Sequence, residues 1–163
     1  MSRPSEKFPV CACLALSILS FFIAFSTFAQ PLRSAQPKAH AFNQRTWVGL
    51  QRELGPQLVV FSSTDCIHCP ALIEALAKNP HVVADRIQLS VIVMDGDQHS
   101  GRAHPYNLAK RVYFFHGNEA AIRFAVNPGW RGETPQVALI QSSGRVKFVL
   151  GMPSNQDIDS LLK

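Results

Sequence analysis

The chain has few cysteines and no cluster of like charges, and these two features limit the classes of protein to which it can belong. Four cysteines in 163 residues are too few for a small domain held together mainly by disulfides. The 16 basic and 11 acidic residues give a net charge of +5, but the basic excess is spread along the chain without a Lys/Arg block. This pattern does not favour nucleic-acid binding, and we expect no nucleic-acid partner. No internal repeat is visible.

The apolar content, in contrast, is sufficient for one folded core. Hydrophobic residues make up 47% of the chain and charged residues 17%. This composition excludes collagen-like, low-complexity and wholly disordered proteins. The length fits a single domain.

The N-terminal segment has the features of an export signal. Arg3 and Lys7 precede a run from Val10 to Phe28 that contains no charge, and Thr27-Phe28-Ala29 ends it with small residues at the −3 and −1 positions of a cleavage site. We therefore expect residues 1–29 to be a signal peptide that is removed on export to the periplasm. The alternative is that residues 10–28 remain as an inner-membrane anchor, because the run approaches the ~20 residues that span a bilayer.

Cleavage after Ala29 would leave Cys66 and Cys69 as the only cysteines. A disulfide between residues three apart closes a loop too small to constrain the unfolded chain much, so a structural role is a poor explanation. In an oxidising compartment, a redox-active pair is the better one. After the signal, we expect a linker over residues 30–41 and one domain over residues 42–163.

The hydrophobic periodicity predicts an α/β domain with a mixed sheet. Buried strands are expected over 58–61 and 87–94, and a hairpin over 137–141 and 146–150 joined by 142–145. Helices are expected over 42–54, from about Cys66 to Asn79, over 107–115 and 119–126, and after Ser154. The segments 107–115 and 119–126 would form a helical insert before the strand that follows Pro135.

The chemistry is concentrated at Cys66-Ile67-His68-Cys69, where a predicted strand runs into a predicted helix. At a helix N-terminus, unpaired N–H groups and the helix dipole stabilise a thiolate, which is the form that attacks disulfides. We expect Cys66 to be the accessible nucleophile, with a pKa below the ~8.5 of a free thiol. Cys69, one turn along, would be shielded and would resolve the mixed disulfide. His68 could favour the thiolate further, whereas Asp65, a possible helix cap, would oppose it.

Other uses of a C-x-x-C motif fit less well. Zinc would need two more ligands at matched spacing, and there is no second cysteine pair. Haem attachment would need a histidine after Cys69, where the chain has Pro70. We therefore expect no metal and no cofactor at this motif. A buried, inert pair is the remaining alternative.

The C-x-x-C motif and Thr134-Pro135, which directly precedes a predicted strand, together resemble the thioredoxin superfamily from about Phe42 to the C-terminus. This resemblance implies a thioredoxin-like fold in which a cis Thr134–Pro135 bond faces the dithiol across a shallow apolar groove. It also implies that Ile67, Thr134 and Pro135 contact the substrate chain.

Within the superfamily, Val60 to Cys66 resembles the catalytic domain of periplasmic disulfide isomerases of the DsbC and DsbG type. Like them, the chain has Val60 where thioredoxins place a buried acid. Only 36 residues would separate the mature start from Cys66, so the N-terminal dimerisation domain of those isomerases is not expected. In length the chain is more similar to short thioredoxin-like proteins associated with conjugation or secretion systems.

Two function classes follow. The first is an exported thiol–disulfide oxidoreductase that acts on cysteine-containing protein substrates and is reset by a membrane redox partner, with conjugation or secretion components as further partners. The second is a non-catalytic thioredoxin-fold component of a conjugation or secretion envelope complex. For the oxidoreductase, the sequence does not distinguish among an oxidase, a reductase and an isomerase.

Two other residue groups are interpreted as ordinary surface. A metal-like set of acids and histidines lies in a loop without a full ligand template, and several basic residues lie in the predicted insert. We expect a solvated loop and a solvated face, with a docking surface for an acidic partner as the alternative for the second. The loop set is Asp95, Asp97, His99 and His104, and the basic set is Arg102, Lys110, Arg111, Arg123 and Arg131.

Overall fold

The computed structural model describes residues 38–163. The predicted signal peptide, its cleavage site and the alternative anchor over residues 10–28 therefore lie outside the described residues. None of the helices within residues 38–163 has the length and apolar character needed to span a bilayer.

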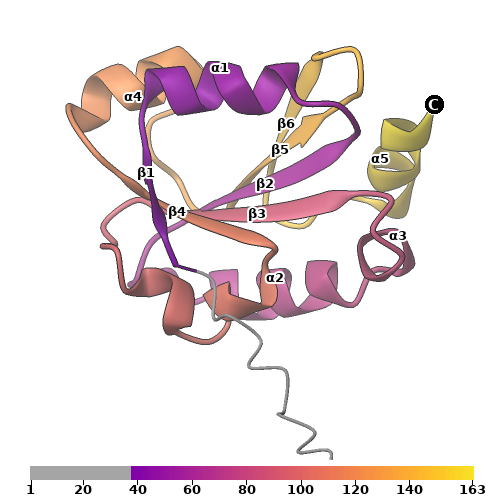
Figure 1. The fold of residues 1–163 in the computed structure, drawn as a ribbon, viewed down its shortest axis with the longest axis horizontal. Coiled ribbons are helices and arrows are strands. Elements are labelled where there is room, and N and C mark those ends of the chain that lie inside the picture. The colour runs from indigo at the N-terminus through magenta and orange to yellow at the C-terminus, as the bar shows by residue number, and fades with distance from the viewer. Residues whose placement is uncertain (1–37) are drawn as a thin grey trace, which may run out of the picture. The chain divides into compact units, whose positions relative to one another are not determined.

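Six strands form one mixed sheet in the order β1-β4-β3-β2-β5-β6 (Figure 1). The four strands on one side of the sheet, β1, β4, β3 and β2, run parallel, whereas β5 is antiparallel to both β2 and β6. The strands are β1 (His40–Phe42), β2 (Gln57–Ser62), β3 (Gln88–Val93), β4 (Arg111–Phe115), β5 (Gln136–Ile140) and β6 (Val146–Leu150).

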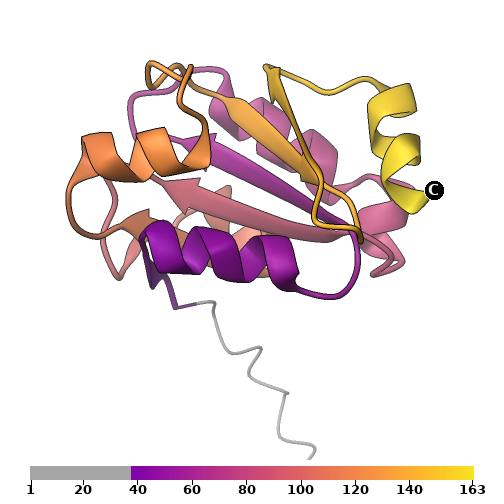
Figure 2. The same ribbon diagram turned by 90° about the horizontal axis from the view of Figure 1, so that it is seen from above.

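Helices cover both faces of this sheet. Helices α1 and α4 lie beside each other on one face, and α2 and α3 lie on the other (Figures 1 and 2). The helices are α1 (Gln44–Arg52), α2 (Cys69–Ala77), α3 (Pro80–Val83), α4 (Glu119–Val126) and α5 (Asn155–Asp159), with 3-10 turns η1 (Ser100–Arg102), η2 (Tyr106–Leu108) and η3 (Ser160–Leu162).

Strand β2 is buried on both faces and connects the two halves of the core. Leu58 and Val60 belong to the apolar layer under α2, which also contains Cys69. Val59 and Phe61 belong to the layer under α1 and α4. A strand covered on both faces has a continuous apolar sequence, which is why this strand could be predicted without alternation.

The predicted helix over 107–115 is wrong. Residues 106–108 form η2, and Arg111–Phe115 is strand β4, which pairs with β3 on one edge and β1 on the other. Val112 and Tyr113 are buried on opposite faces of the sheet, in different core layers. Aromatic and β-branched residues suit such a strand, and pairing on both edges satisfies its backbone. Of the predicted helical insert, only α4 is helical.

The N-terminal boundary of the domain also differs from the prediction. His40 and Ala41, assigned to the linker, form β1 with Phe42, and the helix predicted over 42–54 is α1. Asn43 begins that helix, because its side chain accepts hydrogen bonds from the backbone N–H groups of Arg45 and Thr46.

The segment from β5 to α5 follows the prediction. Strands β5 and β6 form the predicted antiparallel hairpin, and Ser154 caps α5. Gly144 in the turn has a φ of +80°, and a Cβ there would lie 2.9 Å from the Gln51 carbonyl oxygen, so glycine is required on both counts.

Asp157 links the last helix to β6 and should make stability depend on pH. Hydrogen bonds from Lys147 and Ser154 lower the pKa of its carboxyl from 3.8 to about 2. A lowered native pKa stabilises the folded state above the unfolded pKa and loses that effect as pH falls through the native pKa. Asp157→Asn should therefore lower the midpoint of urea unfolding at pH 7, and the difference from wild type should shrink between pH 3.8 and about 2. Asp65→Asn, the same charge change in an exposed turn, is the control; an equal effect there would contradict the assignment.

Candidate active site

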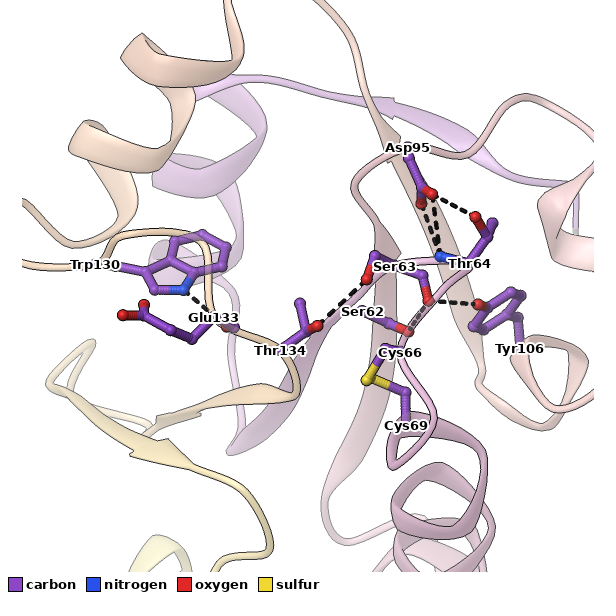
Figure 3. The surroundings of a disulfide bond; sticks show 10 residues. All are labelled: Ser62, Ser63, Thr64, Cys66, Cys69, Asp95, Tyr106, Trp130, Glu133 and Thr134. Atoms are coloured by element: carbon purple, nitrogen blue, oxygen red, sulfur yellow. Dashed lines mark hydrogen bonds between the residues drawn. A yellow bond between two sulfur atoms is a disulfide. The ribbon is translucent and has the colours of Figure 1, made fainter.

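The two cysteines of the C-x-x-C motif form a disulfide at the start of α2 (Figure 3). Their Cα atoms are 5.4 Å apart. Cys69 is the first residue of the helix, and Cys66 lies before it in a turn closed by the Cys69 N–H, which donates to the Cys66 carbonyl at 3.2 Å. The helix thus begins three residues later than predicted. The Cys66 sulfur nevertheless lies at the helix N-terminus, because it is bonded to that of Cys69.

Asp65 does not cap this helix, contrary to one expectation from the sequence. His68 occupies the N-cap position, without a side-chain capping hydrogen bond, and Pro70 follows in the first turn. Proline is favourable there because that position has no helical partner for an N–H. Asp65 is exposed.

The two sulfurs differ in access as predicted. Cys66 is partly exposed, whereas Cys69 is fully buried in the core layer that contains Val60 and Leu72. An attacking group can therefore reach Cys66 but not Cys69. The expected low pKa of the Cys66 thiol stays a prediction.

The Thr134–Pro135 peptide bond is cis, as the resemblance implied. The Thr134 hydroxyl lies 3.2 Å from the hydroxyl of Ser63, which immediately follows β2 and precedes Cys66 by three residues. Figure 3 shows this contact beside the Cys66–Cys69 disulfide. The segment before β5 and the segment before Cys66 are thus in direct contact.

A groove of about 580 Å³ lies between the start of α2 and the segment that carries the cis bond. Its walls come from the start of α2, from the residues around the cis bond and from the end of β6. Leu150 and Met152 are exposed apolar residues there, and Glu133 is the acid on its rim. The lining residues are His68, Ala71, Leu72, Glu133, Thr134, Pro135, Leu150, Gly151 and Met152. Ile67, predicted as a substrate contact, is 83% exposed and does not line this groove.

Trp130 supports the segment that carries the cis bond. Its indole N–H donates to the Glu133 carbonyl at 2.9 Å, and its ring lies 4.8 Å from that of Phe61 between centroids. Trp130 and Trp47 are both buried core residues. The wall of the groove is therefore built on the core layer under α1 and α4.

Side chains from two other elements hold the segment before Cys66, and sequence reasoning missed them. The Asp95 carboxylate accepts hydrogen bonds from the Thr64 N–H, at 2.9 and 3.1 Å, and from the Thr64 hydroxyl. The Tyr106 hydroxyl donates to the Ser63 carbonyl at 3.3 Å. A usable signal existed for Asp95, because it directly follows a predicted strand beside the one that leads to Cys66. Tyr106 had no such signal.

Asp95 therefore does not belong to a metal-like set. His104 lies 3.6 Å from Glu74, and Asp97 caps the N–H of His99. Within residues 38–163, no three histidine, cysteine, aspartate or glutamate side chains are grouped as metal ligands would be.

Most of the basic residues of the predicted insert are engaged in ion pairs. Lys110 pairs with Asp85, Arg123 with Glu119, and Arg111 with Glu53. Arg111 also donates to the side chains of Gln57 and Gln88, so it joins three neighbouring strands at the end of the sheet where they begin. For Arg111, the expectation of a solvated face is wrong.

Comparison with known proteins identifies the fold. No known family profile and no curated protein sequence matches the chain. Solved structures do match: a secreted Mycobacterium tuberculosis disulfide oxidoreductase homologous to E. coli DsbE has 17% identity and a TM-score of 0.50, covering 70% of this chain and 84% of that one. A candidate thioredoxin from Neisseria meningitidis has 20% identity and a TM-score of 0.52, covering 69% and 77%. The thioredoxin domain of a Bacteroides vulgatus thiol-disulfide oxidoreductase has 12% identity and a TM-score of 0.51, and the match covers 71% of this chain and 84% of that one.

Proposed function

From its thioredoxin-like fold and its C-x-x-C disulfide, we propose that this chain is an exported thiol–disulfide oxidoreductase acting on protein substrates. The observation that carries the proposal is the unequal access of the two sulfurs. Cys66 is partly exposed, two residues before His68 of the groove, and its partner Cys69 is buried at the start of α2. A structural disulfide does not require this arrangement, whereas two-step thiol–disulfide exchange does.

The exchange follows from this arrangement. In the reduced protein, the Cys66 thiolate attacks a substrate disulfide, forms a mixed disulfide and releases one substrate sulfur as a thiolate, which takes up a proton. Cys69 then loses its proton and attacks the Cys66 sulfur, which releases the second substrate thiol. The products are the Cys66–Cys69 disulfide and a substrate with two thiols. Run in reverse, the same steps oxidise a substrate dithiol.

The helix start and His68 would assist the first step. The N-terminus of α2 stabilises negative charge on the sulfur next to it. His68 is exposed between the two cysteines, and an imidazolium there would add a positive charge close to the thiolate. We assign Cys66 as the nucleophile, Cys69 as the resolving cysteine and His68 as a residue that tunes the thiolate.

The groove would bind the substrate chain around its cysteine. An extended peptide that pairs with the backbone at Thr134 could place an apolar side chain against Leu150 and Met152. Thr134 and Pro135 are therefore assigned as substrate contacts, and Ile67 as an exposed contact on the other side of Cys66.

The resemblance to DsbC and DsbG favours disulfide isomerisation. Val60 packs in the same apolar layer as Cys69, at the position where thioredoxins place a buried acid. The layer thus offers no carboxylate at that position to take the Cys69 proton, so resolution by Cys69 is less assisted than in thioredoxins. A longer-lived mixed disulfide leaves time for a substrate thiol to attack it, which is what isomerisation requires. Export would place the reaction in the periplasm, with a membrane redox partner and conjugation or secretion components as further partners.

Insulin reduction and recovery of scrambled ribonuclease test this function. We expect the full chain to catalyse both and Cys66→Ala to reduce both to the uncatalysed rate, because the attacking sulfur is gone. Ser142→Ala is the control and should retain activity, because Ser142 is exposed in the turn between β5 and β6, away from the residues assigned to the site. Equal activity of wild type and Cys66→Ala would contradict the proposed enzymatic function. It would favour the alternative of a non-catalytic component of an envelope complex.

A further inference from the structure

The Ser63–Asp65 loop between β2 and Cys66 is short and has no regular secondary structure, and Thr64 and Asp65 are exposed. The backbone of the nucleophile is attached to it directly, because the Cys66 N–H donates to the Ser63 carbonyl at 3.2 Å. Any movement of this loop therefore moves the reacting sulfur.

Sheet register brings an acidic side chain to this loop. Strands β2 and β3 are parallel neighbours, and Ser62, the last residue of β2, pairs with Val93, the last of β3. Two residues further along each chain are Thr64 and Asp95. The Asp95 carboxylate binds both polar groups of Thr64, its N–H and its hydroxyl (Figure 3). Hydrogen bonds to a charged acceptor are about twice as strong as neutral ones.

Two further contacts hold the preceding residue. The Tyr106 hydroxyl donates to the Ser63 carbonyl, the same oxygen that accepts from Cys66, and the Ser63 hydroxyl contacts that of Thr134. The loop is thus tied to the end of β3, to η2 and to the segment before β5. None of these contacts involves a sulfur atom, so breaking the Cys66–Cys69 bond does not itself remove them.

We propose that Asp95 is a positioning residue for Cys66: through Thr64 it fixes the Ser63–Asp65 loop so that the thiolate faces the groove and Thr134 during attack. Tyr106 assists it through Ser63. The inference rests on the proposed thiol–disulfide chemistry of Cys66. Its physical basis is orientation, because attack on a disulfide requires the three sulfurs to be aligned, and a loop with more conformations presents the aligned one less often.

Charge and orientation predict opposite effects, which makes the test decisive. Asp95 is negative, so its removal through charge alone would favour the Cys66 thiolate and speed the reaction near neutral pH. At high pH the cysteine is fully ionised, and the plateau rate depends on its pKa only through nucleophilicity, which falls about threefold for each unit by which the pKa is lowered. A tenfold lower plateau with a pKa change of less than one unit then reports lost orientation.

The experiment measures the reaction of Cys66 with oxidised glutathione between pH 5 and 10 in full chains that carry Cys69→Ser. The Cys66 thiolate attacks the probe, forms a mixed disulfide with one glutathione and releases the other as a thiol; peptide mass spectrometry follows the modified Cys66 peptide. We expect Asp95→Ala, which removes the hydrogen bonds from both the Thr64 N–H and the Thr64 hydroxyl, to lower the plateau rate about tenfold. Thr64→Val removes only the hydroxyl bond and should lower it by less. The double variant should be no slower than Asp95→Ala, because Asp95→Ala already removes the bond that Thr64→Val removes.

Matched variants separate this role from a structural one. Asp97→Ala removes an exposed acid from the same loop and should leave the plateau within about twofold. Asp95→Asn keeps an oxygen that can accept from the Thr64 N–H and should recover most of the rate. Tyr106→Phe, which removes one hydroxyl, should lower the plateau several-fold, and thermal midpoints should stay close to wild type because Thr64 and Asp95 are exposed.

An Asp95→Ala plateau equal to that of Asp97→Ala would overturn the proposal, as would a change in apparent pKa with no change in plateau. Additive losses in the double variant would also contradict it. Failure of this inference and failure of the proposed function are distinguishable. A chain that fails to reduce insulin but shows these glutathione rates retains the positioning role, and an active chain without them loses it.

Discussion

Cys69→Ser should accumulate covalent complexes with protein substrates, whereas Cys66→Ser should form none. The reason is the difference in access between the two sulfurs. Cys66 is partly exposed and can attack a substrate, but Cys69 is fully buried and can reach only Cys66. Without Cys69 the first exchange still occurs, and the mixed disulfide has no internal group to resolve it. Turnover of insulin should fall to the uncatalysed rate in both variants.

Each full-length variant would be incubated with an envelope extract and run on a non-reducing gel, which would show the complexes. Dithiothreitol should reduce the mixed disulfides and separate the proteins. Serine nearly matches the size of cysteine, so the fold should persist in both variants. Peptide mapping should place every substrate on Cys66. Complexes in Cys66→Ser, or substrates attached to Cys69, would reverse the assigned roles. Complexes in neither variant would contradict the exchange chemistry itself.

The sequence was sufficient for those parts of the site that depend on local chain order. The apolar run 58–61 followed by Cys66 and Cys69 indicated a strand leading into a helix, and the structure confirms both β2 and the buried position of Cys69 in α2. The helix start was placed three residues early because a tight turn and a first helical turn have similar local signals. Pro70 favours the observed start, where it lies in the first turn, over a start at Cys66, where its missing N–H would leave the Cys66 carbonyl without its helical partner.

Strand β4 could not be recognised because its sequence is compatible with the periodicity of a helix and with that of a strand. After Arg111, residues 112–115 are apolar or aromatic at consecutive positions, which suits a buried helix as well as a strand covered on both faces. Its pairing with β1 and β3 makes it a strand, and part of β1 lies in residues that were assigned to a linker. Similarly, the contact between Asp95 and Thr64 depends on the register of β2 with β3, which periodicity does not contain.

Phe61→Ala should produce the largest loss of stability of any single change considered, about 3–5 kcal/mol in the free energy of unfolding. Phe61 is fully buried at the centre of the layer under α1 and α4. Its ring lies 5.9 Å from Phe42, 6.1 Å from Trp47 and 4.8 Å from Trp130, measured between centroids. Truncation leaves a cavity that these large rings cannot fill without moving, and domains of this size have only about 5–15 kcal/mol of stability.

Urea unfolding followed by tryptophan fluorescence would measure the loss, because both tryptophans of the chain contact Phe61. Phe124→Ala is the matched control: Phe124 is 68% exposed on α4, and its truncation should change stability by less than about 0.5 kcal/mol. Phe61→Leu should recover a large part of the loss, because it restores most of the apolar volume.

The same change should also affect the groove before the protein unfolds. Trp130 packs on Phe61 and donates to the Glu133 carbonyl, one residue before Thr134. If the cavity lets Trp130 shift, the segment at Thr134 loses its support, while Cys66, held from β3 and η2, keeps its own. Folded Phe61→Ala should therefore bind substrate proteins more weakly, with a higher KM for insulin, yet react with oxidised glutathione at nearly the wild-type rate. Equal losses with both substrates would show that β2 transmits the defect to Cys66 directly, and an unchanged KM would show that Trp130 does not support the groove.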